Sequence, residues 1–157
     1  MAIPRRQGTL LINMILVLDT NVWLDWYHFK DPLTCDLIES RAAQNFRLIT
    51  NNACLNELLT VLRYQHLAGE DTDDECVKKK IKEVAKIAET QEQSSPRFWC
   101  KDPDDVKFLD LSHQARASHL LTKDWDLLKR KNRRALHPNT ISFEIMTPER
   151  FSKRLES

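Results

Sequence analysis

Glycine is almost absent from this sequence: only Gly8 and Gly69 occur among 157 residues. Phosphate-binding loops of the G-x-G-x-x-G and P-loop types each need at least two closely spaced glycines. Two glycines so far apart exclude both motifs. The sequence therefore argues against the nucleotide-cofactor chemistry that those loops support.

Three further absences narrow the class of protein. The four cysteines, Cys35, Cys54, Cys76 and Cys100, form no C-x-x-C pair, which argues against a metal knot and for the reduced thiols of a cytoplasmic protein. No apolar run approaches the roughly 20 residues of a membrane span. The net charge is only +1, so no overall field predicts a nucleic-acid partner.

The length and composition fit one globular domain. A chain of 157 residues, of which 41% are hydrophobic and 30% charged, can bury a substantial core and lacks the composition of a disordered chain. We expect residues 14–157 to form that domain. Residues 1–13 are expected to be a disordered N-terminal extension, with Met14 as an alternative native start, because their apolar run is too short for a signal peptide.

The most informative segment is the run of five apolar residues at 14–18, which ends abruptly at Asp19. Five apolar residues are too few for an isolated helix and predict a strand that is buried on both faces. In open α/β folds, the residues just past such strands line the crevice where ligands bind. Asp19 is therefore the first candidate for a functional carboxylate.

The remaining segments alternate between strand and helix patterns, which predicts a parallel sheet with helices on both faces. Asp31–Pro32 and Thr147–Pro148 have the pattern of helix N-termini, and Asn51 or Asn52 can cap another helix. Strands are predicted at residues 14–18, 46–50, 119–122 and 141–145, and helices after residues 31 and 51, over residues 76–89, from residue 103 and from residue 148, with a short turn or helix at 124–128.

Five acids are expected to converge at one edge of this sheet. Asp19 and Asp124 directly follow strands. Asp104 and Asp105 lie at a helix N-terminus, and Glu57 lies about 9 Å into a helix at 1.5 Å per residue. In right-handed βαβ units, the carboxyl ends of strands and the amino ends of helices share one edge. All five carboxylates can therefore face one crevice.

Each of these acids except Asp19 also has a simple structural interpretation. Asp104 and Asp105 can cap their helix, Asp124 can be a turn residue or a cap, and Glu57 can be a solvated helix position. The expected convergence of these acids favours a functional site over the structural interpretations, because neighbouring carboxylates raise each other's pKa unless a cation neutralises them. Oxygen ligands suit Mg²⁺ or Mn²⁺, and a cluster without cysteine or histidine disfavours zinc.

Several segments together resemble the PIN-domain nucleases, in particular the branch assigned to toxin–antitoxin systems. The match lies in LVLDTNV at residues 16–22, NEL at 56–58, CKDPDDVKFL at 100–109 and LLTKDWDLL at 120–128. The closing IMTPERF at residues 145–151 is similar to the usual last strand and helix of that branch. The resemblance covers about residues 14–151, and the order and spacing of its motifs make it specific.

The resemblance implies a three-layer α/β/α sandwich around a short parallel sheet of four to five strands, with the first strand central. It implies a hydrolase that uses Mg²⁺ or Mn²⁺ as an endoribonuclease on single-stranded RNA. It further implies a toxin held by a cognate antitoxin protein, and homodimers are common in such folds. The alternative is a non-catalytic PIN-like domain that binds RNA or a protein partner.

The resemblance also assigns roles by position. Asp19, Glu57, Asp105 and Asp124 match the acidic quartet, with Asp104 as the rival of Asp105. Asp19, Asp105 and Asp124 would hold the metal, and Glu57 would be either a further ligand or the base that deprotonates the attacking water. Supporting roles are implied for Thr20, Asn21 and Thr122, which would orient acids or waters, and for Asp102, Asp104 and Asp126, which lie close to the quartet.

The chain departs from the family pattern at Lys123, because glycine often precedes the fourth acid. A lysine there can pair with a carboxylate, reach a phosphate, crowd the loop or compete with the metal. A basic run follows close by; such runs are usually solvated loops, but a phosphate backbone needs only local positive charge. The candidates for substrate binding are Lys123, Lys129, Arg130 and Lys131, with Arg133 and Arg134 beyond them. Trp23, Trp26, Trp99 and Trp125 are candidates for stacking on unpaired bases, although core packing is the commoner role.

Two other families that place an aspartate after their first strand do not fit. A phosphatase of the haloacid dehalogenase type needs a second aspartate two residues later, where this chain has Asn21. A response-regulator receiver needs an acidic pair ahead of its phosphorylated aspartate, and no acid precedes Asp19 in the sequence.

Overall fold

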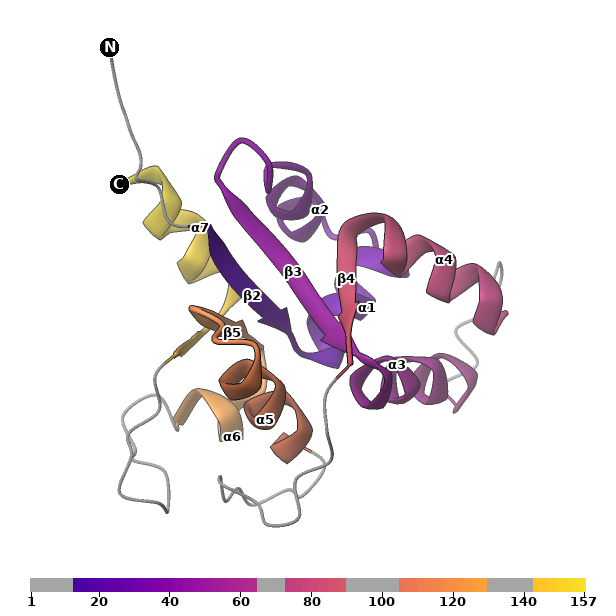
Figure 1. The fold of residues 1–157 in the computed structure, drawn as a ribbon. Helices are drawn as coiled ribbons and strands as arrows, with labels where there is room; N and C mark the ends of the chain where they lie inside the picture. Colours follow the sequence, from indigo (N-terminus) through magenta and orange to yellow (C-terminus); the bar gives the residue numbers. More distant parts are fainter. Residues whose placement is uncertain (1–12, 65–72, 90–104, 130–142) are drawn as a thin grey trace.

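The computed structural model describes residues 13–64, 73–89, 105–129 and 143–157. Their centre is a five-stranded sheet in the order β4-β3-β2-β5-β6, and every neighbouring pair is parallel (Figure 1). The predicted short parallel sheet with the first strand in its centre is confirmed. The strands are β2 (Met14–Leu18), β3 (Phe46–Asn51), β4 (Ala85–Ala88), β5 (His119–Leu121) and β6 (Glu144–Met146).

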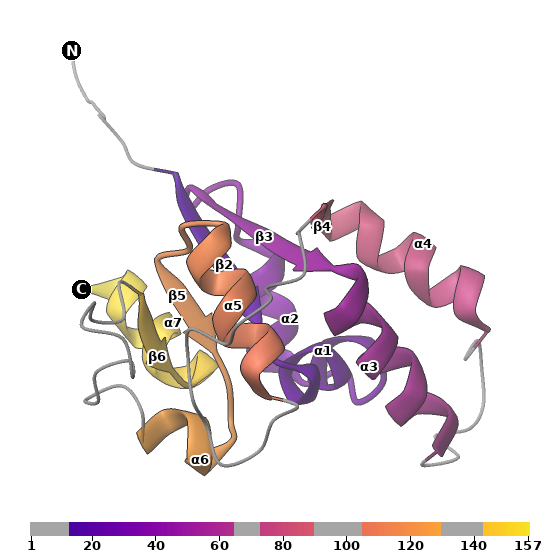
Figure 2. The same cartoon turned by 60° about the horizontal axis from the view of Figure 1, so that its bottom comes forward.

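Helices cover both faces of the sheet. In Figure 1, α5 lies in front of the sheet while α1 and α2 lie behind it, and Figure 2 shows the same layers after rotation. The predicted three-layer α/β/α sandwich is confirmed. The helices among the described residues are α1 (Thr20–Tyr27), α2 (Pro32–Glu39), α3 (Asn52–Tyr64), α4 (Asp74–Val84), α5 (Val106–Gln114), α6 (Trp125–Leu128) and α7 (Pro148–Glu156).

Strand β2 separates two hydrophobic cores. Leu16 and Leu18 point into one core, which also holds the apolar faces of α1, α2, α3, α4 and α7. Val17 points the other way, into a core formed with α5 and α6. Successive side chains of a strand face opposite sides, so a run of apolar residues is required where both sides are covered. This explains why residues 14–18 are uninterrupted by polar side chains.

Helix starts follow the predicted capping residues. The carboxylate of Asp31 accepts a hydrogen bond from the backbone N–H of Thr34 at 3.0 Å, and the hydroxyl of Thr147 accepts one from Arg150 at 3.1 Å. Asn51, rather than Asn52, caps α3, because its side-chain oxygen accepts from the backbone of Cys54 at 2.9 Å.

The helix predicted over residues 76–89 is wrong at its C-terminal end. Helix α4 ends at Val84, and the next four residues form the edge strand β4. Strand β4 pairs with β3 from Leu48↔Ala85 to Asn51↔Ala88. Hydrogen bonding to β3 thus overrides the helical propensity of this alanine- and lysine-containing segment.

Other boundaries differ by small amounts. Helix α1 was not predicted, and it begins directly after Asp19. Strand β6 begins at Glu144, while residues 141 and 142 of the predicted strand lie outside the described residues. No helix within the described ranges has the length and apolar character that a membrane crossing requires.

Candidate active site

Asp19 lies at the carboxyl end of the central strand and begins the site. Its side chain is buried, with 5% exposed, and it is the N-cap of α1. The Oδ1 atom accepts a hydrogen bond from the backbone N–H of Thr20 at 2.7 Å. Its backbone carbonyl accepts from Val22 and Trp23 at the start of the helix. A buried strand on one side and a helix start on the other therefore fix this carboxylate at the edge of the sheet.

The hydroxyl of Thr122 connects Asp19 to the neighbouring strand. Thr122 directly follows β5 and is fully buried. Its Oγ1 donates a hydrogen bond to Oδ2 of Asp19 at 2.6 Å and accepts one from the backbone N–H of Asp124 at 2.9 Å. One side chain thus holds the ends of β2 and β5 in register and orients two of the predicted acids.

Asp124 serves as the N-cap of α6. Its Oδ1 accepts a hydrogen bond from the backbone N–H of Asp126 at 2.9 Å. The capping interpretation of Asp124 is therefore correct, and it coexists with a place beside Asp19. The side chain of Asp126 forms an ion pair with Lys129 at 3.5 Å.

Glu57 lies in the second turn of α3 and is held by two other elements. The hydroxyl of Thr20, on α1, donates a hydrogen bond to its Oε2. The ammonium of Lys107, on α5, lies 2.7 Å from its Oε1. Both side chains of this ion pair are about three-quarters buried, with 25% and 24% exposed. The carboxylate of Glu57 is therefore paired with a cationic side chain of the protein, Lys107.

Asp105 is the buried residue at the N-cap of α5, with 8% of its surface exposed. Asp105 thus occupies the predicted N-cap position, but its side chain makes no capping hydrogen bond to that helix. It lies two residues before Lys107, whose side chain reaches Glu57.

Burial and neighbouring charge act together on Asp19. Burial raises the pKa of the Asp19 carboxyl from 3.8 to about 6, against the opposing effect of the Thr122 and Thr20 hydrogen bonds. The negative charges of Glu57 and Asp124 contribute smaller parts of this rise in pKa. The structure therefore brings Glu57 and Asp124 each within electrostatic reach of Asp19.

The present arrangement of side chains is not a complete metal cage. No group of three or more His, Cys, Asp or Glu side chains in the described part of the chain is arranged to hold an ion. Lys107 binds one oxygen of Glu57, and one oxygen of Asp124 accepts the helix-cap hydrogen bond. The donors are nevertheless all carboxylate oxygens, and a desolvated carboxylate beside two others favours a hard divalent cation.

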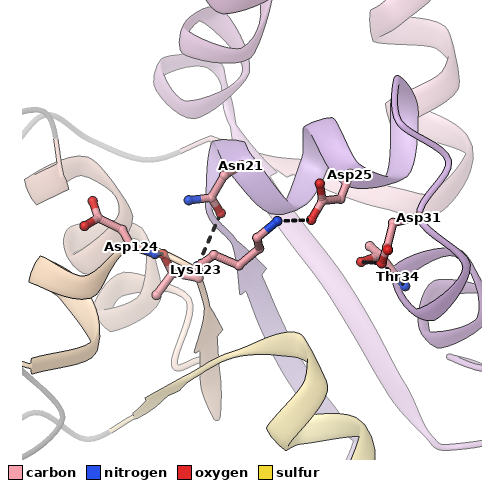
Figure 3. Close-up of polar contacts among 7 residues, drawn as sticks. Asn21, Asp25, Asp31, Thr34, Lys123 and Asp124 are labelled. Atoms are coloured by element: carbon pink, nitrogen blue, oxygen red, sulfur yellow. Dashed lines mark hydrogen bonds and ion pairs between the residues drawn. The ribbon is translucent and has the colours of Figure 1, made fainter.

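The predicted supporting residues differ in their contacts. Thr20 and Thr122 each donate a hydrogen bond to a site carboxylate. The side-chain oxygen of Asn21 lies 3.4 Å from the backbone nitrogen of Lys123, and the ammonium of Lys123 lies 2.7 Å from Oδ2 of Asp25 on α1. Figure 3 shows Lys123 reaching toward Asp25, with Asp124 directed to the opposite side. Asp102, Asp104, Trp99, Arg130, Lys131, Arg133 and Arg134 lie outside the described residues.

Two residues of the site were not predicted from the sequence. The sequence could have pointed to Lys107, since this residue lies within the DPDDVKFL segment two residues after Asp105. No sequence pattern points to Asp25, because only the fold brings α1 beside the loop after β5.

A family model described as "PIN domain" matches residues 15–126. The matched region is more than two thirds of the chain and includes all four acids of the predicted quartet. No curated protein matches the sequence.

Proposed function

The chain belongs to the PIN domain family, whose members are generally nucleases, and on that premise we propose that it is a metal-dependent endoribonuclease that cleaves single-stranded RNA. The observation that carries the proposal is the carboxylate cluster. Asp19, Glu57 and Asp124 converge at the carboxyl edge of the sheet, where Thr20 and Thr122 hold them by hydrogen bonds. Clusters of this kind are costly to fold and are retained where they serve chemistry.

The donor set fits Mg²⁺ or Mn²⁺. Asp19, Asp105 and Asp124 would hold the ion, with Glu57 as a further ligand or as the base that deprotonates water. When bound, a divalent cation lowers the pKa of the attacking water and neutralises negative charge on the phosphate. The raised pKa of Asp19 supports this assignment, because it reflects a buried negative charge that lacks full compensation.

The chain's own residues prepare that chemistry. Thr122 fixes the direction of the Asp19 carboxylate and the position of the Asp124 backbone. Lys107 and Thr20 fix the position of the Glu57 carboxyl group beside the cluster. A base that is already oriented can accept a proton from water without reorganisation.

Substrate contacts would come from cations near Asp124. Lys129 ends α6 and is exposed, and Arg130 and Lys131 follow it in the sequence. Such a group would attract the phosphates of RNA through local charge alone. Lys123 is the weaker candidate, because its ammonium is already paired with Asp25.

The biological role that we propose is that of a cytoplasmic toxin restrained by a cognate antitoxin protein. This rests on the sequence resemblance of residues 100–128. Induced expression in a bacterial host tests it: the wild-type chain should arrest growth, Asp19→Asn should not, and the product of a neighbouring small reading frame should relieve the arrest. Arrest by both chains alike would contradict the toxin role.

Cleavage assays on the purified full-length chain test the enzymatic proposal. With Mg²⁺ or Mn²⁺, the wild-type chain should cleave labelled single-stranded RNA, and EDTA should abolish cleavage. Asp19→Asn should lower the rate by at least about 100-fold, the effect of removing a principal electrostatic group. Asp36→Asn is the matched control, because Asp36 is exposed on α2.

The same assay separates the alternative of a non-catalytic RNA- or protein-binding domain. Full activity of Asp19→Asn, or cleavage that persists in EDTA, would refute the assigned site. Binding of RNA with no cleavage under any metal condition would favour the non-catalytic domain.

A further inference from the structure

Trp125 is unusual among the tryptophans that the structure describes. Trp23 is buried with 2% exposed, and Trp26 packs against Trp23 at a ring-centroid distance of 5.6 Å. Trp125, by contrast, has 70% of its surface exposed. Single exposed hydrophobic residues are common on protein surfaces; what distinguishes Trp125 is its place directly after Asp124, one of the site acids.

The backbone beneath Trp125 is fixed. Trp125 is the first residue of α6 and directly follows Asp124, whose carboxylate caps that helix through the Asp126 N–H. Two residues later, Leu127 is fully buried in the core on the α5 side of the sheet. The indole therefore projects from a short, anchored helix that starts at one of the site acids.

A cation follows this short helix. Lys129, the C-cap residue of α6, has αR backbone angles and comes four residues after Trp125, a spacing that makes two side chains neighbours where the helical turn continues. Its ammonium lies 3.5 Å from Asp126, and the two side chains are 42% and 38% exposed. Exposed pairs of this kind are weak, so a phosphate can displace Asp126. An aromatic face beside an available cation matches the base and the phosphate of a nucleotide.

We propose that Trp125 stacks on an unpaired nucleobase of the RNA and that Lys129 binds a neighbouring backbone phosphate. This inference rests on the proposed function and assigns its substrate subsite. Stacking requires an accessible base face, so the subsite selects single-stranded over duplex RNA and is tolerant of base identity.

Equilibrium binding tests the subsite in the Asp19→Asn background, where RNA is not consumed. The probe is a short fluorescein-labelled oligouridylate, followed by anisotropy in Mg²⁺. Trp125→Ala should raise Kd by about 5- to 150-fold, because stacking is worth about 1–3 kcal/mol per base. Trp125→Phe should retain most of the affinity. Tyr64→Ala is the matched control, since Tyr64 is 80% exposed at the far end of α3.

RNA with a single abasic position separates stacking from a structural effect. An abasic site at one position of the oligouridylate should weaken binding to the chain that retains Trp125. An abasic site at the same position should have no effect on binding to Trp125→Ala. An abasic penalty of equal size in both chains, or equal losses for Trp125→Phe and Trp125→Ala, would overturn the proposal.

The salt dependence of binding tests the lysine. Lys129→Gln should reduce the slope of log Kd against log salt by about one phosphate contact. Lys153→Gln is the matched control, because Lys153 also belongs to an exposed ion pair, with Glu149 at 3.4 Å on α7. An unchanged slope for Lys129→Gln would refute the phosphate contact.

The outcomes distinguish this inference from the proposed function. If the wild-type chain cleaves RNA and Trp125→Ala binds it normally, the subsite alone is wrong. If the wild-type chain neither binds nor cleaves RNA, both fail. Unchanged RNA binding together with loss of a protein partner in Trp125→Ala would assign the ring to protein recognition and also overturn the proposal.

Discussion

At the scale of single residues, Asp19 shows a conflict between stability and function. Burial raises the pKa of its carboxyl to about 6, and the Thr122 and Thr20 hydrogen bonds offset only part of this effect. The folded state therefore holds a proton on Asp19 more tightly than the unfolded state does. Ionised Asp19 destabilises the fold when no cation is bound, which is expected of a residue kept for chemistry.

Asp19→Asn should therefore stabilise the chain in EDTA at about pH 7, by about 1–3 kcal/mol. The wild-type stability should rise as pH falls from about 6 to about 4, because the folded-state pKa lies above the unfolded-state value of 3.8. The variant should lack this part of the pH dependence. Urea unfolding across that range measures both effects. A variant less stable than the wild type at pH 7, with the same pH dependence, would contradict the destabilising charge.

Lys107 is the second residue whose role depends on the cation. Without a metal, its ammonium supplies the positive charge beside Glu57 at 2.7 Å. Lys107→Met should lower Tm in EDTA by about 2–4 °C, the effect of losing about 1 kcal/mol in a chain of this size. In saturating Mg²⁺ the loss should be smaller, because the ion then neutralises the carboxylates. Lys80→Met, at an exposed position of α4, is the control; equal losses in EDTA and Mg²⁺ would refute this role.

At the scale of elements, local patterns predicted most of the sandwich. The apolar run at 14–18 indicated β2 because burial on both faces leaves only that composition, and Asp31, Asn51 and Thr147 marked helix starts through their own hydrogen bonds. Strand β4 was missed because its conformation is set by pairing with β3, which no local pattern records. The ion pair between Lys123 and Asp25 was hidden for the same reason.

That ion pair ties the loop after β5 to helix α1. Lys123 contributes its ammonium to Asp25 at 2.7 Å, and its backbone nitrogen lies 3.4 Å from the side-chain oxygen of Asn21 (Figure 3). Asp19 caps the same helix and Asp124 follows Lys123 in the loop. The pair therefore acts on the relative position of two site acids.

A double-mutant cycle tests this positioning role. Asp25→Asn and Lys123→Met should each lower the RNA cleavage rate several-fold at saturating substrate, and the double variant should lose little more, since either change removes the same contact. Glu144 and Arg154 form the control pair, also at 2.7 Å, between β6 and α7; changes there should leave cleavage unaltered. Additive losses at Asp25 and Lys123 would mean that the two residues act separately.

At the scale of the whole molecule, the sheet order creates the site. Strands β3, β2 and β5 are adjacent, and the acids come from the segments that follow them: Glu57 from α3, Asp19 from the N-cap of α1 and Asp124 from the N-cap of α6. The parallel arrangement was predictable from the alternation of patterns, and so was the shared edge. The cap on one Asp124 oxygen was one of the interpretations that the sequence offered, because it is a local contact with the N–H of Asp126. The sequence could not predict that Lys107 would occupy an oxygen of Glu57, because that contact depends on packing between α5 and α3.

Divalent cations should stabilise the whole fold if the cluster is a metal site. Saturating Mg²⁺ or Mn²⁺ at about 100 times Kd stabilises by about 2.7 kcal/mol, which corresponds to a rise in Tm of about 5–10 °C for a chain of this size. Asp19→Asn and Asp124→Asn should show little rise, whereas Asp36→Asn should follow the wild type at matched ionic strength. A rise of equal size in Asp19→Asn would place the ion elsewhere.

The Mg²⁺ concentration at the midpoint of the rise in Tm reports which side-chain contact the ion must break in order to bind. The described acids do not form a ready group of three ligands, and Glu57 is bound to Lys107. Binding through Glu57 therefore has to break that ion pair, at a cost in affinity. Lys107→Met should shift the titration strongly to lower Mg²⁺ concentration if Glu57 is a metal ligand, and only slightly, through the loss of one nearby positive charge, if Glu57 acts only on water. The shift thus assigns the role of Glu57 without any measurement of cleavage.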